Sequence, residues 1–240
     1  MPLCTFLSGG LDSSIISRIA SDGAKSHGRR LCTYSVDYTD NDKFFKESLF
    51  QPNKDSDYIS LISNYIGSKH KNIVLDNKAV AHALEESTEA RSLPGFTDVD
   101  SSLLLFCREV QREQTVALSG ECADEIFGGY PWYHNKDILF EETFPWSRSI
   151  DVRQSILKPG LLKNGGEFVH EKYLETVKSA SYLESDSKTE RRMREMFMLN
   201  MDWFMQTLLM RKDMMSMHCS LEVRVPFCDY RIVEYAYNMP

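Results

Sequence analysis

The segment LSGGLDSS, residues 7–14, joins a short apolar stretch to a helical pattern. The residues PLCTFL, which lead into it, lack polar alternation, and this predicts a strand buried on both faces. Gly9 and Gly10 allow a tight turn and let a ligand approach the backbone closely. Apolar residues at helical spacing follow, so a helix is expected over residues 12–26. The segment is therefore predicted to be a strand, a glycine turn and the start of a helix.

The start of this helix is a candidate anion-binding site. Its free N–H groups and the positive end of its dipole favour negative charge. Ser8, Ser13 and Ser14 offer hydroxyl donors to phosphate oxygens. Asp12 is an acid in position to hold a metal ion. The alternative is an ordinary strand-to-helix turn that binds nothing.

Predicted strands alternate with helices along the first half of the chain. The strands are expected at residues 2–7, 30–38, 71–76 and 115–120, and the helices at residues 12–26, 55–68, 77–91 and 100–113. This order is typical of an α/β fold, with a parallel sheet flanked by helices. Ligands of such sheets bind beyond the carboxyl ends of the strands. Polar or glycine residues follow three of those ends: Ser8-Gly9-Gly10, Asp37 and Ser119-Gly120-Glu121.

We expect two regions in the chain. An α/β nucleotide-binding core is expected over residues 1–150, and a helical part over residues 151–240, where the strands stop. Met, Leu and aromatic residues fill the segment 191–217, which favours an adaptable apolar core over a cofactor site. The segment 40–54 is expected to be a long surface loop.

Composition excludes several classes of protein. A net charge of −7 argues against a protein that binds nucleic acid or a membrane surface. No apolar run approaches the roughly 18 residues of a transmembrane helix, and the first residues do not form a signal peptide. The 6 cysteines include no CxxC pair, which indicates reduced, mostly buried thiols in a cytoplasmic protein.

The segment SGECADEIFGGY, residues 119–130, again places glycine and acids after a predicted strand. Glu121, Asp124 and Glu125 are spaced so that one helical turn would bring them to the same side. Like charges so close repel each other, and a divalent cation would relieve this repulsion. Mg²⁺ prefers one or two carboxylates together with phosphate oxygens. The segment thus predicts a metal site beside the phosphate site, with a solvated acidic turn as the alternative.

These motifs carry a family resemblance. SGGLDSS resembles the pyrophosphate loop of the ATP pyrophosphatases. Together with SGECADEIFGGY and SLEVRVPFCD, residues 220–229, it resembles the synthetase domain of glutamine-dependent asparagine synthetases of the B type. The resemblance implies a fold like that of the adenine nucleotide alpha hydrolases and a ligase reaction. In that reaction a carboxylate attacks the α-phosphorus of ATP, pyrophosphate leaves on Mg²⁺, and ammonia displaces AMP from an acyl-adenylate.

The resemblance also implies roles for individual residues. The pyrophosphate would be held by the loop of Ser8, Gly9, Gly10, Asp12, Ser13 and Ser14. Asp12 and Asp124 would bind Mg²⁺, the backbone near Phe6 and Val36 would hold adenine, and Gly120 would lie by the ribose. Glu121 would act as a base toward ammonia or orient the adenylate, whereas Glu125 and Tyr130 would line the acceptor pocket.

One departure from the family concerns the acceptor. The family carries Thr-Thr-x-Arg, whose arginine suits the α-carboxylate of aspartate, whereas this chain has GFTDVDSSLLLFCRE at residues 95–109. Asp98 and Asp100 would repel that carboxylate unless an arginine such as Arg91 or Arg108 pairs with them. The acceptor is thus aspartate or a related carboxylic acid. The alternatives are a β-lactam synthetase-like or peptide-modifying enzyme, and a catalytically silent ATP-binding module.

The resemblance covers only the synthetase domain of the family. Family members begin with a glutaminase domain whose nucleophile is an N-terminal cysteine, a role that Cys4 does not fit. We expect the glutaminase domain of a longer chain to supply ammonia from glutamine, and a homodimer is left open. The family also places a phosphate-contacting lysine beyond the element matched by YRIVEYAYNMP. The chain as given is therefore expected to bind nucleotide without making amide, and Lys212 is expected on a solvated helix face.

Overall fold

The computed structural model describes residues 2–46 and 55–239. Contacts divide the chain into two compact units, Met1–Ala123 with Thr207–Tyr230 and Asp124–Gln206 with Arg231–Pro240. The predicted functional division at residue 150 stays a prediction. None of the helices in the described ranges is long and apolar enough to cross a membrane.

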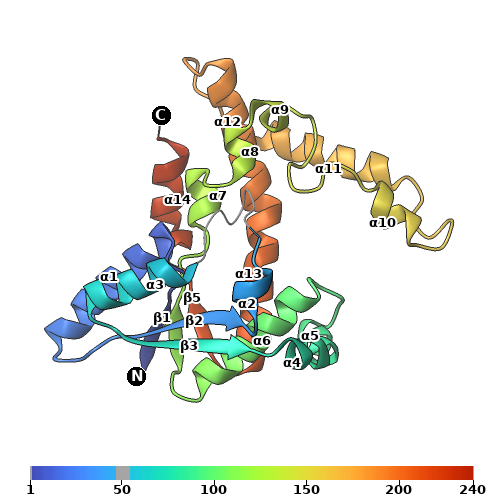
Figure 1. Ribbon diagram of the computed structural model, residues 1–240. Helices are drawn as coiled ribbons and strands as arrows, with labels where there is room; N and C mark the ends of the chain where they lie inside the picture. Colours follow the sequence, from blue (N-terminus) through green and yellow to red (C-terminus); the bar gives the residue numbers. More distant parts are fainter. Residues whose placement is uncertain (1, 47–54, 240) are drawn as a thin grey trace. The chain divides into compact units, whose positions relative to one another are not determined.

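The first unit contains a parallel sheet with the strand order β3-β2-β1-β4-β5 (Figure 1). Its strands are β1 (Leu3–Phe6), β2 (Cys32–Tyr38), β3 (Lys69–Leu75), β4 (Val116–Leu118) and β5 (Glu222–Arg224). β1 lies in the centre, so both of its faces are covered, and this explains why its residues do not alternate. The predicted α/β fold is confirmed.

Helices flank this sheet on both faces (Figure 1). The main ones are α1 (Leu11–Ser26), α3 (Asp55–Ile66) and α6 (Asp98–Gln111), and the shorter ones are α2 (Asn41–Phe44), α4 (Asn77–His82) and α5 (Leu84–Arg91). Parallel crossovers are right-handed, and the strand order reverses direction after β3. α1 and α3 therefore cover one face, and α6 covers the other. α2 lies in the segment expected to be a surface loop, and residues 47–54 of that segment lie outside the described ranges.

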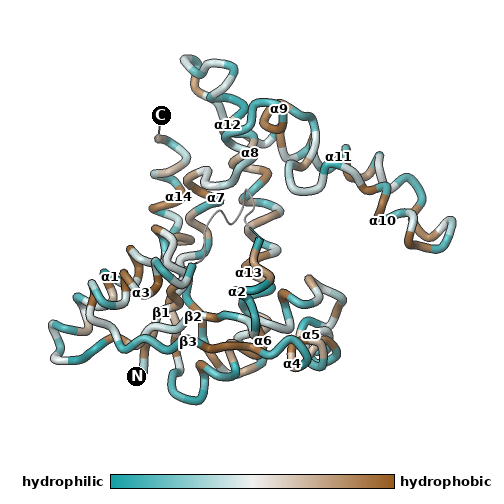
Figure 2. Tube along the Cα trace, viewed as in Figure 1, coloured by the Kyte–Doolittle hydropathy of each residue, from teal (hydrophilic) through white to brown (hydrophobic). Residues whose placement is uncertain are grey.

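The core of the first unit packs between the sheet and α6. Figure 2 shows the hydrophobic end of β3, which contributes Ile73 and Leu75. The ring of Phe6 meets that of Phe106 edge to face, with 4.8 Å between their centroids. The buried members of this core are Cys4, Phe6, Tyr34, Ile73, Leu75, Val80, Phe106, Cys107, Val110, Ala117 and Leu221. This packing holds the carboxyl end of β1, from which the SGGLDSS loop leaves.

The expectation that strands stop after residue 150 is wrong. α13 (Gln206–His218) leads into β5, which pairs with β4 in the register Ala117↔Val223. β5 has only three residues, and two of them, Glu222 and Arg224, are charged and exposed. So short and polar a segment carries no strand pattern of its own. Its conformation comes from the open edge of β4.

The expectation of six reduced cysteines is also wrong. Cys122 and Cys228 form a disulfide, although 106 residues separate them in the chain. Cys4 and Cys107 are buried free thiols, as expected, and Cys32 and Cys219 are partly buried ones. Spacing in the sequence does not reveal a pairing over such a distance, because the fold alone brings β4 and β5 together.

The second unit is helical. It includes α7 (Ala123–Phe127) from its second residue on, α8 (Pro131–His134), α9 (Lys136–Leu139), α10 (Asp151–Ser155), α11 (Gly165–Ser179), α12 (Lys188–Leu199), a π-helical segment at Asn200–Met205, and α14 (Tyr230–Tyr237) from its second residue on. Its buried core residues are Trp132, Tyr133, Leu139, Phe144, Tyr173, Met196 and Leu199. Met196 and the nearby Met205 are buried, in agreement with the interpretation of the Met-rich segment as core.

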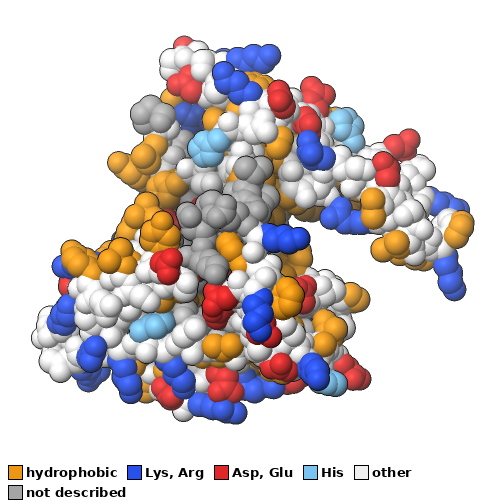
Figure 3. Space-filling view, in the orientation of Figure 1, with side chains coloured by type: hydrophobic (Ala, Val, Ile, Leu, Met, Phe, Trp, Pro, Cys, Tyr) orange, Lys and Arg blue, Asp and Glu red, His pale blue; other side chains and the backbone are white. Residues whose placement is uncertain are grey.

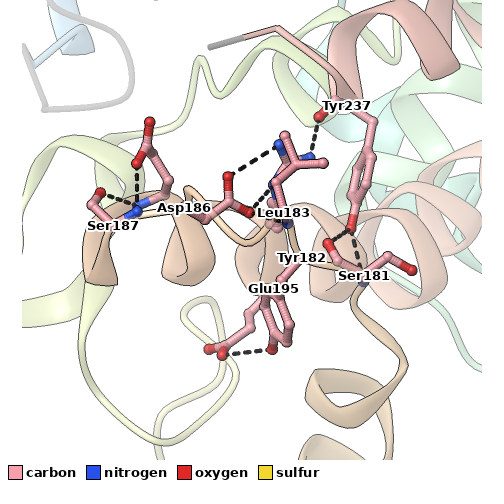
Figure 4. A network of polar contacts seen from close by, with 9 residues as sticks. Ser181, Tyr182, Leu183, Asp186, Ser187, Glu195 and Tyr237 are labelled. Carbon is pink, nitrogen blue, oxygen red and sulfur yellow. Dashed lines mark hydrogen bonds and ion pairs between the residues drawn. The ribbon is translucent and has the colours of Figure 1, made fainter.

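A polar network joins α12, α14 and the segment before α12 (Figure 4). Asp186 accepts a hydrogen bond at 2.8 Å from Arg194, whose guanidinium also donates to the carbonyl of Tyr237. The hydroxyl of Tyr237 in turn donates to the carbonyl of Ser181 at 2.7 Å. The Arg194–Asp186 pair is largely buried, so it fixes α14 more firmly than an exposed pair would.

Charged side chains of both signs lie close together on the visible face of the first unit (Figure 3). Ion pairs of this unit include Lys71 with Glu113 at 2.7 Å and Arg18 with Asp22 at 2.8 Å. Acidic and basic side chains are thus interspersed on this face.

Candidate functional site

The loop between β1 and α1 has the predicted strand–turn–helix geometry. Gly9 adopts a φ of +82°, and a Cβ there would stand 2.7 Å from the Cβ of Tyr58. The hydroxyls of Ser13 and Ser14 donate to the carbonyl of Gly10 at 3.2 and 2.6 Å, and the Ser8 and Ser13 hydroxyls lie 3.0 Å apart. Gly10, the N-cap residue, has no side chain to occupy the first N–H groups of α1. The serines thus hold the loop in shape and leave the end of the helix open to an anion.

Gly120 brings the second motif against this loop. It follows β4, which pairs directly with β1. A Cβ on Gly120 would stand 2.7 Å from the backbone nitrogen of Ser13 and 2.9 Å from the carbonyl carbon of Asp12. Only glycine permits so close an approach. The two motifs, far apart in sequence, therefore meet at one edge of the sheet.

Asp12 lies in the first turn of α1 and is partly buried. Burial raises the pKa of its carboxyl above the usual value, because desolvation disfavours the charged form. No ion-pair partner for it occurs within residues 2–46 and 55–239. A carboxylate in this position, beside an anion site, is a suitable ligand for a hard cation.

The residues proposed to hold adenine lie at the ends of neighbouring strands. Phe6 is the last residue of β1, and its side chain is buried in the core. Val36 lies near the end of β2, and its side chain is 41% exposed. Both strands end at the same edge of the sheet as the SGGLDSS loop, because β1 and β2 are parallel.

Two cations of α13 lie close to the same carboxylate oxygen of Glu121. Lys212 places its Nζ 2.9 Å from Glu121 Oε1, and the Arg211 guanidinium lies 3.8 Å from the same oxygen. The Lys212 side chain is only 10% exposed, so the expectation of a solvated helix face is wrong. Its Nζ also stands 5.2 Å from the centroid of the Phe6 ring. The helical pattern of α13 did not reveal this, because the partner comes from the end of β4.

The three acids of the second motif do not share one helical side. Cys122 has a φ of +78°, and α7 begins only at Ala123, so Glu121 stands outside the helix. In the part of the chain that the structure describes, no group of three His, Cys, Asp or Glu side chains could hold a metal ion. The expectation of a three-acid face is therefore wrong.

Asp124, Glu125 and Tyr130 belong to the second unit. Glu125 is buried, and its Oε1 accepts a hydrogen bond of 2.6 Å from the Tyr130 hydroxyl. Asp124 is exposed, and a Cβ on Gly129 would collide with its carboxylate. The structure therefore brings Glu125 and Tyr130 together, and their role in an acceptor pocket stays a prediction. Whether Asp124 joins Asp12 in one metal site stays a prediction, since the two acids belong to different units.

The question about Asp98 and Asp100 has a clear answer. Asp100 is buried and pairs with Arg91 at 3.2 Å, and the backbone N–H of Phe96 donates to the same carboxylate at 2.9 Å. Arg108 contacts Glu86 instead. Asp98 is exposed. The repulsion expected from Asp100 is thus neutralised by Arg91, one of the two arginines considered.

Arg211 was missed in the sequence, and Lys212 was expected in a different environment. They stand together in LLMRKDMM, where apolar residues surround two adjacent cations. Buried charges need partners, so a lysine in such a setting indicates an acid nearby in space. Identifying that acid as Glu121 required the fold.

Comparison with known proteins agrees with this geometry. Residues 1–240 match the family described as Asparagine synthase. The chain is 49% identical to asparagine synthetase [glutamine-hydrolyzing] 3 of Bacillus subtilis over 243 residues, which is 100% of this chain and 39% of that protein. It is 27% identical to the B. subtilis asparagine synthetase [glutamine-hydrolyzing] 1, with 100% of this chain and 41% of the relative covered. Asparagine synthetase [glutamine-hydrolyzing] 2 of Arabidopsis thaliana is 28% identical over 60% of this chain and 25% of its own length.

The chain spans about two fifths of the length of the B. subtilis relatives. The family match nevertheless covers all of this chain, and all three motifs lie within it. The chain belongs to the asparagine synthase family.

Proposed function

We propose that this chain is the synthetase part of a glutamine-dependent enzyme that converts aspartate into asparagine. The reaction would pass through a β-aspartyl-adenylate and release pyrophosphate and AMP. Family membership supports the proposal, and one observation carries it. Gly120 packs against the N-terminus of α1, so a phosphate-binding loop and the acid Glu121 meet at the carboxyl edge of one sheet.

The phosphates would bind at the loop of Ser8 to Ser14. In the first step a substrate carboxylate oxygen bonds to the α-phosphorus, and the bond from that phosphorus to the pyrophosphate oxygen breaks. Negative charge grows on the leaving pyrophosphate. The open N–H groups of α1 and its dipole are suited to that charge before the reaction begins. Adenine would lie against the backbone near Phe6 and Val36, and the ribose by Gly120.

Mg²⁺ would be held by Asp12, together with Asp124 and phosphate oxygens. The chemistry of the donors fits, because Asp12 is a carboxylate without a cationic partner in the described ranges and stands beside the anion site. The ion would neutralise part of the charge on the leaving group.

Glu121 would act in the second step. The nitrogen of ammonia bonds to the acyl carbon, the bond from that carbon to the AMP oxygen breaks, and the nitrogen must lose a proton. The Glu121 carboxylate is the proposed acceptor of this proton. Glu125 and Tyr130, held together by their hydrogen bond, would line the pocket for the acceptor.

One observation favours a second candidate function. Arg91 is the buried arginine near the segment where the family has its own, yet Asp100 already neutralises it. Such an arginine is a weaker site for the α-carboxylate of aspartate. A related amide-forming enzyme with another carboxylic acid as substrate, β-lactam synthetase-like or peptide-modifying, is therefore the alternative.

The proposed partners are small molecules and a further domain. ATP, aspartate and ammonia would be the substrates, and a glutaminase domain of the longer protein would release the ammonia from glutamine. A cytoplasmic location is also proposed, and the oligomeric state is left open.

The test is a screen for ATP–pyrophosphate exchange with the natural full-length protein. Amino acids and related carboxylic acids are offered one at a time with Mg²⁺. We expect exchange with aspartate, followed by asparagine formation once ammonia is added. Exchange driven by another acid would favour the second candidate function. Tight ATP binding without exchange for any acid would indicate a silent ATP-binding module.

A further inference from the structure

The two carboxylate oxygens of Glu121 have different partners. Oε1 has Lys212 at 2.9 Å and Arg211 at 3.8 Å. Oε2 is buried and has no hydrogen-bond partner within residues 2–46 and 55–239. The Nε of Arg211 is buried without a partner in the same ranges. One acceptor and one donor beside the same ion pair thus lack a hydrogen-bond partner in the described ranges.

Such atoms are rarely left open in folded proteins. A buried polar atom without a partner loses its hydration and gains no bond in return. Two of them beside one ion pair indicate a group that is supplied from outside the chain. Ammonia has N–H donors for Oε2, and a substrate oxygen could accept from Arg211.

Lys212 is held in place from two strands. Its Nζ lies near Glu121, after β4, and 5.2 Å from the centroid of the Phe6 ring, at the end of β1. A lysine side chain has many rotamers, and two such contacts restrict it to few. Its charge is directed at a carboxylate, which does not suit a lysine whose main task is to bind phosphate.

We propose that Lys212 is a positioning residue for Glu121, an inference that rests on the proposed function. It holds Oε1 and so leaves Oε2 in a fixed position to accept the proton from ammonia. Lys212 acts through Glu121 and does not touch the nucleotide.

The experiment uses the natural full-length protein with ATP, Mg²⁺, aspartate and ammonia. Lys212→Met is expected to lower kcat about 10- to 100-fold, the range found when a partner that orients a reactive ligand is removed. The KM for ATP stays within about threefold, because the loop and Asp12 are intact. Lys212→Arg restores most of the rate. Lys71→Met removes an exposed ion pair with Glu113 from the same unit and is the matched control, with unchanged kinetics.

A double-mutant cycle distinguishes positioning from other roles. In a Glu121→Gln background, Lys212→Met should lower kcat by less than about a further threefold, because the carboxylate that Lys212 orients is absent. Thermal unfolding and ATP binding confirm that each variant folds, and Lys212→Gln replaces the Met variant should that one fail.

Three results would overturn the proposal. The first is a full additive loss in the double variant, and the second is a raised KM for ATP with kcat intact, which would make Lys212 a phosphate ligand. The third is wild-type kinetics for Lys212→Met. A wild-type protein that forms no amide from any acid would instead overturn the proposed function and this inference with it.

Discussion

Asp12 and Glu121 follow neighbouring parallel strands, β1 and β4, yet their surroundings are opposite. Asp12 has no cation of the protein within the described ranges, and its pKa is raised by burial. Glu121 has two cations at one oxygen, supplied by α13. An acid without a protein cation is available to a metal ion, whereas an acid with one is held in a defined orientation. This difference supports the two proposed roles, Asp12 as a ligand for the nucleotide's metal and Glu121 as an acceptor in proton transfer.

The largest effect is expected from Glu121→Gln. The amide cannot take the proton from ammonia, so asparagine formation should fall about 10²- to 10⁴-fold. ATP affinity should hold, because Glu121 has no part in the phosphate loop. Kinetics of the natural full-length protein with ammonia check the loss of turnover, and calorimetric titration with ATP checks the affinity. Loss of ATP affinity with turnover intact would indicate that Glu121 is a metal ligand, the role proposed for Asp12, and the two acids would then not differ in function.

The next effect is expected at Gly120, which packs against the SGGLDSS loop. In Gly120→Ala the new Cβ would stand 2.7 Å from the Ser13 nitrogen, so the loop must shift. We expect ATP affinity to fall roughly tenfold or more, and the free energy of unfolding to fall by about 1–3 kcal/mol.

Gly23→Ala is the matched control for this variant. It lies within α1, and a Cβ there meets no atom within 4 Å. It should raise the free energy of unfolding by about 0.5–1 kcal/mol and leave ATP affinity alone. Equal ATP affinity in Gly120→Ala and wild type would show that the close approach does not shape the nucleotide site.

A smaller effect on binding is expected from Asp12→Asn. Loss of one charge-assisted contact commonly weakens binding roughly tenfold. The loss should appear only with Mg²⁺ present, which titrations of ATP with and without the ion reveal. Asp22→Asn, in an exposed pair with Arg18 on the same helix, is the control and should bind normally. A loss of the same size without Mg²⁺ would argue against Asp12 as the metal's ligand.

The smallest effect concerns pH and stability without nucleotide. Since the folded-state pKa of Asp12 is raised, the folded protein binds this proton more tightly than the unfolded chain. The stability that Asp12 contributes is full below its unfolded pKa and is lost as pH rises through its folded pKa.

The free energy of unfolding of Asp12→Asn, relative to wild type, should therefore increase with pH across that window. The change should be less than about 1 kcal/mol, because the carboxyl is partly solvated. Denaturant unfolding at a series of acidic to neutral pH values measures it. The opposite slope would mean that Asp12 has a cationic partner, as Glu121 does.

Much of the fold could be predicted because its evidence is local. The strands β1 to β4 and the helices α1, α3 and α6 stand close to their expected positions. β5 was missed, since three residues with two charges carry no periodic pattern, and only the edge of β4 makes them a strand. The helix expected over residues 77–91 is divided into α4 and α5 at Ala83. No glycine or proline in this segment indicates the break.

The sequence by itself determined the SGGLDSS loop, because glycine at a positive φ and the start of a helix depend on neighbouring residues. It also determined the α/β class through the alternation of strands and helices. Only the tertiary structure decided the partners of the acids. Lys212 for Glu121, Arg91 for Asp100 and Tyr130 for Glu125 depend on side-chain positions, and the Cys122–Cys228 disulfide joins residues 106 positions apart. A sequence shows which residues carry charge, but the low dielectric of the interior makes their pairing depend on which elements pack together.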